Sequence, residues 1–430
     1  MSLPDIVERS SGEFRHSGAF RVPTAPLRRA RLADALSVLL PRSDQSWLLR
    51  ACLLSAEPGR DAWRQWQRFH EDVKAALSDD ASGAKQILPL LYTTLKRNGA
   101  DLDPSLRPYL TTSYAREEMR NEAYRAIGRA ALQALAAHGV NVIAVKGAAL
   151  AESVYGHPAQ RHSHDIDLLV APDDLDRAIR ALASARFTRA AASLDHGALD
   201  VRLDHPSGLP VELHGTLFAI PFYDPPMADV WQRTRPSMVA GVATRTLTPE
   251  MSLVHVCGHA SYSWSRQSLR WVCDAWFIIE READLDWHEV LDIARRTRLT
   301  LPLLVMIRYL HDTCGARVPG LFLARLGELF DRAPAVERDV ALFAARSGTR
   351  EPLLSILRRM PGGWRTQASA VRWLLFPSRE YLKGEAVGKA STGGSFRYLS
   401  RVIEYARGSS TTTRAWGRAA EQRTDGSNYQ

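Results

Sequence analysis

The stretch "DIDLLV", residues 165–170, constrains the fold more than any other because it sets two aspartates into an apolar run. A run of this length and composition is typical of a buried strand, where an unpaired carboxylate is costly. Side chains alternate along a strand, so Asp165 and Asp167 should share one face while Ile166, Leu168 and Val170 point to the other. Adjacent carboxylates repel each other unless a cation joins them, and hard oxygen ligands suit Mg²⁺ or Mn²⁺. The sequence therefore predicts a strand with one metal-binding face and one core face.

A third carboxylate follows in "PVELHG", residues 210–215. Glu212 lies between two apolar residues, which should face the core while Glu212 faces the opposite side. If this strand neighbours the first, Asp165, Asp167 and Glu212 can complete a two-metal site, and they are the candidate metal ligands and catalytic residues. His214 shares the face of Glu212 and is a further candidate, although a strand histidine is more often a packing residue.

The turn upstream of these strands predicts a phosphate-binding site. In "VKGAAL", residues 145–150, a glycine stands where a short strand turns directly into a helix. Exposed amides at the start of a helix bind phosphate oxygens, and Lys146 beside Gly147 adds a point charge. Arg161, four residues before Asp165, can reach the same anion from the intervening loop. We therefore expect Lys146, Gly147 and Arg161 to bind phosphates.

The spacing of apolar residues changes along the sequence, and these changes mark the boundaries of the predicted regions. Amphipathic patterns over 29–111 and 249–382 predict two helical regions, and short β-branched runs between helical segments predict a small α/β unit over 112–248. The expected fold class is α+β, with a small mixed-sheet domain flanked by N-terminal and C-terminal helical regions. Residues 1–28 are expected to form a flexible arm, and 383–430, rich in Gly, Ser, Thr and Arg, a mobile basic tail.

The charged residues and the cysteines indicate what kind of partner the protein binds and in which cellular compartment it works. Lysine and arginine number 56 against 47 for aspartate and glutamate, and the net charge of +9 favours anionic partners. The four cysteines are far apart without a CxxC pair, which argues against a disulfide framework or a thiolate zinc site and fits a reducing cytoplasm. No run approaches the roughly 18 apolar residues of a membrane helix, so no membrane partner is expected.

Two polar features in the C-terminal helical region have competing interpretations. His255 and His259 in "HVCGH" lie one helical turn apart, a spacing that could suggest a zinc site. Cys257 would point to another side of the helix, which argues against such a site. Gly258, between the two histidines, indicates close helix packing. Asp274 is a polar residue in an apolar helix, so it either pairs with a basic neighbour such as Arg270 or faces the cleft.

The motifs together resemble the bacterial group of uncharacterised nucleotidyltransferases within the DNA polymerase β superfamily. The resemblance covers roughly residues 40–310 and rests on "VKGAAL", the arginine before "DIDLLV", the "VELH" strand, and the helices "TPEMSLVHVCGHASYSW" and "LRWVCDAW". It implies a nucleotidyltransferase fold, an NTP partner and a Mg²⁺ or Mn²⁺ cofactor. The superfamily usually carries a serine after the glycine of the turn; here Ala148 stands there, so one hydroxyl ligand for the triphosphate is missing.

The leading functional hypothesis is transfer of a nucleoside monophosphate from an NTP to an acceptor hydroxyl or phosphate, with release of pyrophosphate. Asp165 and Asp167 would hold two Mg²⁺ ions, and Glu212 would bind the ion that lowers the pKa of the acceptor hydroxyl. The alternatives are a catalytically inactive nucleotide-binding or regulatory module of the same fold and, third, an Asp-x-Asp glycosyltransferase. The acceptor stays open among small molecules, peptides or proteins, and RNA.

Overall fold

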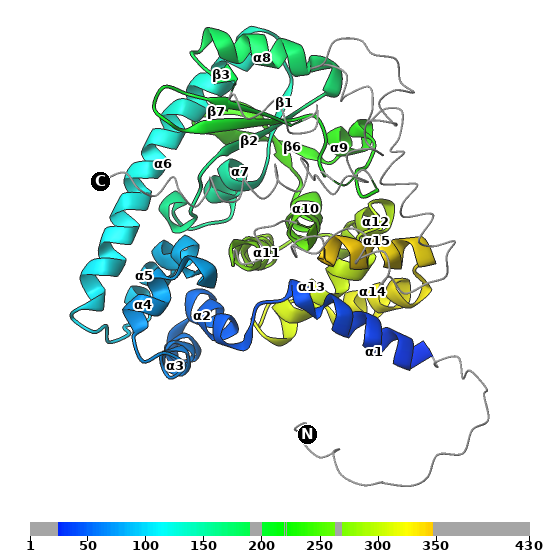
Figure 1. Cartoon of the computed structure of the whole chain (residues 1–430). Coiled ribbons are helices and arrows are strands. Elements are labelled where there is room, and N and C mark those ends of the chain that lie inside the picture. Colours follow the sequence, from blue (N-terminus) through cyan, green and yellow to red (C-terminus); the bar gives the residue numbers. More distant parts are fainter. Residues whose placement is uncertain (1–24, 190–199, 219, 221, 263–268, 347–430) are drawn as a thin grey trace, which may run out of the picture.

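The computed structural model describes residues 25–189, 200–218, 220, 222–262 and 269–346 (Figure 1). Only residues 25–28 of the expected arm are described, and they lie in the first helix. The expected basic tail, 383–430, lies outside the described residues. Across the described ranges, no helix combines the length and apolar character that crossing a bilayer requires.

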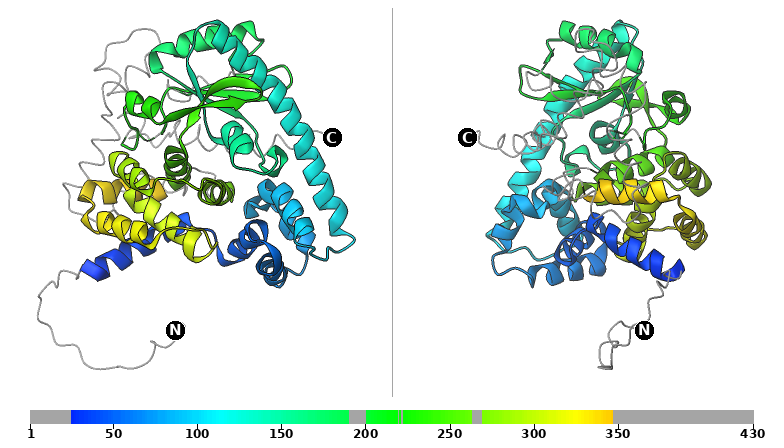
Figure 2. Two further views of the ribbon diagram at one scale, coloured as in Figure 1. Left: turned by 180° about the vertical axis from the view of Figure 1, so that it is seen from behind. Right: turned by 45° about the vertical axis from the view of Figure 1, so that its right-hand side comes forward.

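The N-terminal region is helical, as expected. Its helices are α1 (Ala25–Leu36), α2 (Ser43–Leu53), α3 (Ala56–Gln67), α4 (Val73–Ser78) and α5 (Leu88–Arg97), with short 3₁₀ segments at Ser37–Leu39, Asp80–Ser82 and Ala84–Ile87. The 32-residue helix α6 (Leu106–Ala137) then runs from α5 to the sheet (Figure 1). Because α6 continues through residues 111 and 112, the N-terminal helices and the sheet unit share one rigid element. Helix α1 instead packs against the C-terminal helices (Figure 2).

One mixed seven-stranded sheet forms the centre of the expected α/β unit. Its strands are β1 (Val142–Ala144), β2 (Ile166–Val170), β3 (Thr188–Arg189), β4 (Asp200–Asp204), β5 (Pro210–His214), β6 (Thr234–Val239) and β7 (Val242–Leu247). They are ordered β3-β4-β5-β2-β1-β7-β6, with the pairs β2–β5 and β1–β7 parallel and the other pairs antiparallel. The helices α7 (Lys146–Ser153), α8 (Leu175–Ser184) and α9 (Met227–Gln232) and the 3₁₀ segments Pro158–Gln160 and Pro172–Asp174 connect them. The expected fold class is confirmed.

The two faces of the sheet belong to different hydrophobic clusters, as alternation along the strands predicts. One cluster joins the alternate residues of β2, Ile166, Leu168 and Val170, to apolar side chains of α6 and α8. Leu169 belongs instead to the cluster that extends through the C-terminal helices. Since Asp167 and Leu169 are two residues apart in β2, Asp167 faces the side of the C-terminal helices. The predicted separation of Asp167 from Ile166, Leu168 and Val170 is therefore confirmed for this strand, although Leu169 makes the face of Asp167 partly apolar.

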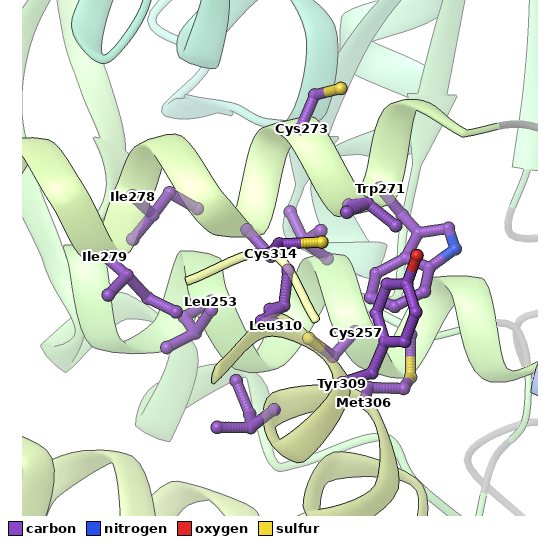
Figure 3. Close-up of a cluster of buried hydrophobic side chains, with 14 of the residues drawn as sticks. Leu253, Cys257, Trp271, Cys273, Ile278, Ile279, Met306, Tyr309, Leu310 and Cys314 are labelled. Carbon is purple, nitrogen blue, oxygen red and sulfur yellow. The ribbon is translucent and has the colours of Figure 1, made fainter. Parts of the chain in front are cut away.

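The C-terminal region is also helical over the described residues. It contains α10 (Pro249–Tyr262), α11 (Arg270–Arg281), α12 (Trp287–Arg296), α13 (Thr300–Asp312), α14 (Gly320–Arg332) and α15 (Ala335–Arg346). Cys257, Cys273 and Cys314 lie among its aliphatic and aromatic side chains (Figure 3). All four cysteines are buried free thiols. They therefore contribute to the core as small apolar side chains.

The packing of α10 gives a test of the interpretation of Gly258. A Cβ atom at this position would lie 2.6 Å from Leu299 Cδ1 and 2.7 Å from Phe218 Cε1. We expect Gly258→Ala to lower the free energy of unfolding by about 1–3 kcal/mol, because the core around it must shift. Gly320→Ala is the control, since no atom lies within 4 Å of its Cβ position, and it should leave stability nearly unchanged. Urea denaturation of both variants measures the difference; equal midpoints would refute close packing at Gly258.

Candidate active site

The register of β2 and β5 brings three potential metal ligands together. The two strands are parallel neighbours, and Asp167 lies directly opposite Glu212. One ligand atom from each of Asp167, Glu212 and His214 lies within 4.8 Å of the others. Donors bound to one ion at about 2.1 Å are separated by up to about 4.2 Å, so small side-chain movements suffice for shared coordination. The convergence of Asp167 and Glu212 follows the sequence prediction, and His214 joins them.

Asp167 is the buried centre of this group. Its side chain is 3% exposed, and its Oδ1 atom accepts hydrogen bonds from Lys146 Nζ and His214 Nε2, each at 2.8 Å. Burial alone would raise the pKa of Asp167, but the charge of Lys146 and the hydrogen bond from His214 hold that pKa well below its ordinary value. Burial would likewise lower the pKa of Lys146, but the charges of Asp167 and Glu212 raise it. The lysine and the aspartate therefore form a charged pair.

The backbone at the start of α7 is strained where it presents this lysine. Lys146 has φ +49, a left-handed conformation that costs an unbranched L-residue about 1–2 kcal/mol. The next residue is glycine, and a Cβ atom on Gly147 would lie 2.7 Å from Arg161 Nη1 and 3.0 Å from Ser163 Oγ, so a larger residue would displace these side chains. The loop before β2 therefore packs directly on the turn that carries Lys146. Phosphate binding by Lys146 and Gly147 stays a prediction.

Asp165 has a different environment from Asp167. Asp165 lies immediately before β2 and is not part of the group formed by Asp167, Glu212 and His214. Its Oδ2 atom is 3.1 Å from His164 Nε2. Burial would raise the pKa of Asp165, but His164 lowers it below its ordinary value. Arg270 Nη1 is 3.4 Å from His164 Nδ1 and can donate to it, which leaves the Nε2 hydrogen directed at Asp165. A metal-binding role for Asp165 stays a prediction.

Arg161 takes part in a buried ion pair. It donates from Nε and Nη2 to the two carboxylate oxygens of Asp274, at 2.8 and 2.9 Å, and from Nη1 to Ser163 Oγ at 3.1 Å. Tyr155 donates to the same carboxylate at 2.7 Å. The expected direct contact with phosphate therefore competes with these internal partners. Of the two interpretations of Asp274, pairing is confirmed, but the partner is Arg161 rather than Arg270.

The sequence did not predict the contacts that three polar side chains make with this loop. Glu117 of α6 is buried, accepts a hydrogen bond from Ser163 N at 3.2 Å, and lies 2.7 Å from His162 Nδ1. Arg270 donates from Nη1 to the carbonyl oxygen of His162 at 3.0 Å. The third is His164, and its spacing from His162 directly before the acidic strand was the one available signal. Glu117 and Arg270 gave none, because charged residues are common on helices.

Two hollows adjoin the turn that carries Lys146. One lies between α6, α7 and the β6–β7 turn, and its lining includes Tyr124, Ala148 and Asp165. The other is lined by Lys146 and His255, among others. Among the described residues, His255 Nε2 has no hydrogen-bond partner although the residue is only 2% exposed. Burial first, and then the charge of Lys146, lowers the pKa of His255 to about 3, so this ring is neutral.

The comparisons with known proteins give one family. A model of the family described as uncharacterised nucleotidyltransferase matches residues 79–315, which is more than half of the chain. The match contains α6, the whole sheet, and α10 and α11, and so includes every element that contributes to the group around Asp167. No curated protein and no solved structure matches the chain.

Removing one partner of the buried pair of Arg161 and Asp274 should strongly destabilise the fold. Asp274→Ala leaves a buried guanidinium without its counter-ion, so we expect a loss of about 3–5 kcal/mol in the free energy of unfolding. Asp274→Asn keeps an acceptor for Arg161 and should lose less. The control is Glu328→Ala, which removes an exposed pair with Arg325 and should cost at most about 1 kcal/mol. Urea denaturation compares the three; similar losses for Asp274→Ala and the control would contradict the assignment.

The neutral state of His255 predicts a pH dependence of stability. Its folded pKa of about 3 lies below the ordinary 6.5, so the unfolded chain binds an extra proton between these values and stability falls as the pH falls. His255→Leu should reduce proton uptake on unfolding at pH 5 by about one proton. Urea midpoints measured from pH 4 to 7 give this number. Replacing the exposed His288 with Gln is the control; an unchanged slope in His255→Leu would contradict the prediction.

Proposed function

The chain belongs to the uncharacterised nucleotidyltransferase family, and from this membership we propose that it transfers a nucleoside monophosphate from an NTP to an acceptor, releasing pyrophosphate. The observation that carries the proposal is the convergence of Asp167, Glu212 and His214 beside Lys146. A buried carboxylate paired with a lysine at a glycine turn supplies both parts of the chemistry, a place for a divalent cation and a charge for phosphate.

The residues fit a divalent ion, either Mg²⁺ or Mn²⁺. Asp167, Glu212 and His214 would hold it, and Asp165 is the adjacent carboxylate that can join after leaving His164. The imidazole of His214 favours Mn²⁺ over Mg²⁺, because Mg²⁺ prefers oxygen ligands. An ion bound there would neutralise phosphate charge and lower the pKa of the acceptor hydroxyl.

The side chains then have separate roles in the transfer. Lys146 and the first amides of α7 bind phosphate oxygens, which compensates for the hydroxyl that Ala148 lacks. The acceptor oxygen forms a bond to the α-phosphorus, the bond to pyrophosphate breaks, and Glu212 accepts the hydroxyl proton. Arg161 acts as a positioning residue, because its contacts hold the loop against Gly147. Fixed positions and neutralised charge supply most of the rate in phosphoryl-type transfer.

The acceptor is a small molecule, a peptide or protein, or RNA, and the net charge of +9 suits any anionic member of these classes. The buried free cysteines fit a cytoplasmic site of action. The competing proposal is a nucleotide-binding module without catalysis. It draws on Ala148 in place of serine and on the pairing of Asp165 with His164.

The proposal predicts labelling of an acceptor. Purified protein is incubated with dialysed lysate from its own host, Mg²⁺ or Mn²⁺, and each of the four NTPs labelled at the α-phosphate, and products are identified by mass spectrometry. Asp167→Asn should lower the transfer rate about a hundredfold or more, because it removes the central carboxylate. Asp173→Asn, at an exposed position just after β2, is the matched control and should keep the wild-type rate. If wild type binds NTP but labels nothing, the binding-module alternative replaces this proposal.

A further inference from the structure

His162, in the loop before β2, has one nitrogen bound to the protein and one that is accessible. Its Nδ1 lies 2.7 Å from Oε2 of Glu117, a carboxylate of α6 whose side chain is 6% exposed. The His162 side chain is 23% exposed, and across the described ranges its Nε2 atom is neither buried nor bonded to a protein partner. Because an ionised carboxylate only accepts hydrogen bonds, Nδ1 carries the hydrogen, and in the neutral ring Nε2 presents a lone pair.

The surroundings keep this imidazole neutral and fixed in place. Burial, above all, lowers the pKa of His162 below its ordinary value, although the hydrogen bond and the charge of Glu117 oppose this effect. Glu117 also accepts a hydrogen bond from the backbone amide of Ser163 at 3.2 Å, and Arg270 donates to the carbonyl oxygen of His162 at 3.0 Å. Helices α6 and α11 therefore hold the backbone around the ring. A group fixed in this way is preorganised, which lowers the entropic cost of binding a ligand.

The position and chemistry of His162 suit recognition of an acceptor. Its ring centroid is 6.1 Å from that of His164, and His164 Nε2 lies 3.1 Å from Asp165 Oδ2, so His162 lies near the acidic strand without belonging to it. A nitrogen lone pair attracts the O–H of an alcohol, whereas it repels the oxygens of an ionised phosphate, which carry no hydrogen. The arrangement therefore distinguishes between hydroxyl and phosphate acceptors.

We propose that His162 is an acceptor-binding residue that selects a hydroxyl compound by accepting a hydrogen bond from it at Nε2. Glu117 is then a positioning residue, because it fixes which nitrogen of the ring carries the hydrogen. This inference rests on the proposed function and specifies its acceptor as a hydroxyl rather than a phosphorylated end. The competing interpretation gives His162 only a structural role, as the donor that satisfies the buried carboxylate of Glu117.

Two substitutions separate binding from structure. His162→Asn keeps a donor to Glu117, because the asparagine amide nitrogen occupies nearly the place of the histidine Nδ1, and it removes Nε2. Glu117→Gln keeps an acceptor for the amide of Ser163 but offers an N–H to His162 Nδ1, which forces the ring hydrogen onto Nε2 and turns this atom from acceptor into donor. The matched control is His138→Asn, since Nδ1 of this exposed histidine lies 2.8 Å from the carbonyl oxygen of Ala134.

The transfer arm repeats the lysate labelling with Mn²⁺ and each α-labelled NTP, and mass spectrometry identifies whether the NMP is joined to a hydroxyl or to a phosphate. We expect wild type to label a hydroxyl, and His162→Asn and Glu117→Gln to label it about tenfold more slowly in dilute lysate, as the loss of one hydrogen bond predicts. The deficit should shrink as the lysate is concentrated, because weaker acceptor binding raises KM rather than lowering kcat. His138→Asn should match wild type.

Two further measurements require no acceptor. Nitrogen-15 NMR of protein labelled in histidine, assigned with His162→Asn, should show the His162 hydrogen on Nδ1 in wild type and on Nε2 in Glu117→Gln. Titration calorimetry with Mn²⁺ and each NTP should give His162→Asn the nucleotide affinity of wild type, and urea denaturation should give it the same midpoint. If Glu117→Gln does not fold, the His162→Asn measurements and the wild-type spectrum decide.

The outcomes separate this inference from the proposed function. A hydrogen on Nε2 in wild type, a phosphate as the labelled group, or a wild-type labelling rate in His162→Asn overturns the inference and leaves the transfer in place. A loss of nucleotide affinity in His162→Asn also overturns it, because Nε2 would then bind the NTP, and unfolding of this variant supports the structural interpretation instead. A wild-type protein that labels nothing removes the proposed function and this inference with it.

Discussion

The burial of Asp167 is the constraint on which the site depends. A carboxylate at 3% side-chain exposure would take up a proton unless cations or donors met it, and here two elements supply them. Lys146 comes from the strained turn into α7, and His214 from the parallel neighbour strand β5. Neither partner can move far without leaving a charge uncompensated in the interior, which costs several kcal/mol. The strand register that places His214 and the strained backbone that places Lys146 both serve to compensate the charge of Asp167.

A second buried charge joins the sheet unit to the C-terminal helices. Arg161 and Asp274 lie 113 residues apart in the chain and make a bidentate pair away from water. The same guanidinium lies against Gly147, so the loop that leads into β2 is held between α11 and the lysine turn. A buried pair of this kind contributes less to net stability than to fixing one arrangement, because desolvation offsets much of its attraction. Its contribution here is to the position of the loop that leads to Asp165 and Asp167.

Features of the fold and the site that depend on local sequence could be predicted, whereas those that depend on contacts between distant residues could not. Alternation in "DIDLLV" and "PVELHG" was enough to predict which side chains of β2 and β5 face the core, because a strand has a period of two whatever its partners. The helix–strand order likewise predicted the mixed sheet and its helical flanks. The partners of Arg161, Asp274 and His164 depend instead on contacts across about a hundred residues, which no local pattern records. Lys146 and Asp167 are only 21 residues apart, but their ion pair also depends on how the strand and the turn pack, so the local pattern predicted a phosphate partner for Lys146 and not this pair.

The contacts that α6 and α11 make with the loop before β2 show that the flanking helices do more than form the walls of an acceptor site. Walls that only select an acceptor would need no buried charges directed at the strand. Yet Glu117 of α6 accepts a hydrogen bond from the backbone of Ser163, and Arg270 of α11 donates to the carbonyl of His162. Both helices therefore hold the short loop that ends at Asp165, one on each side of its backbone. Because side chains set by neighbouring elements are more precise than those on free loops, the helices determine the geometry of the acidic group as much as the sheet does.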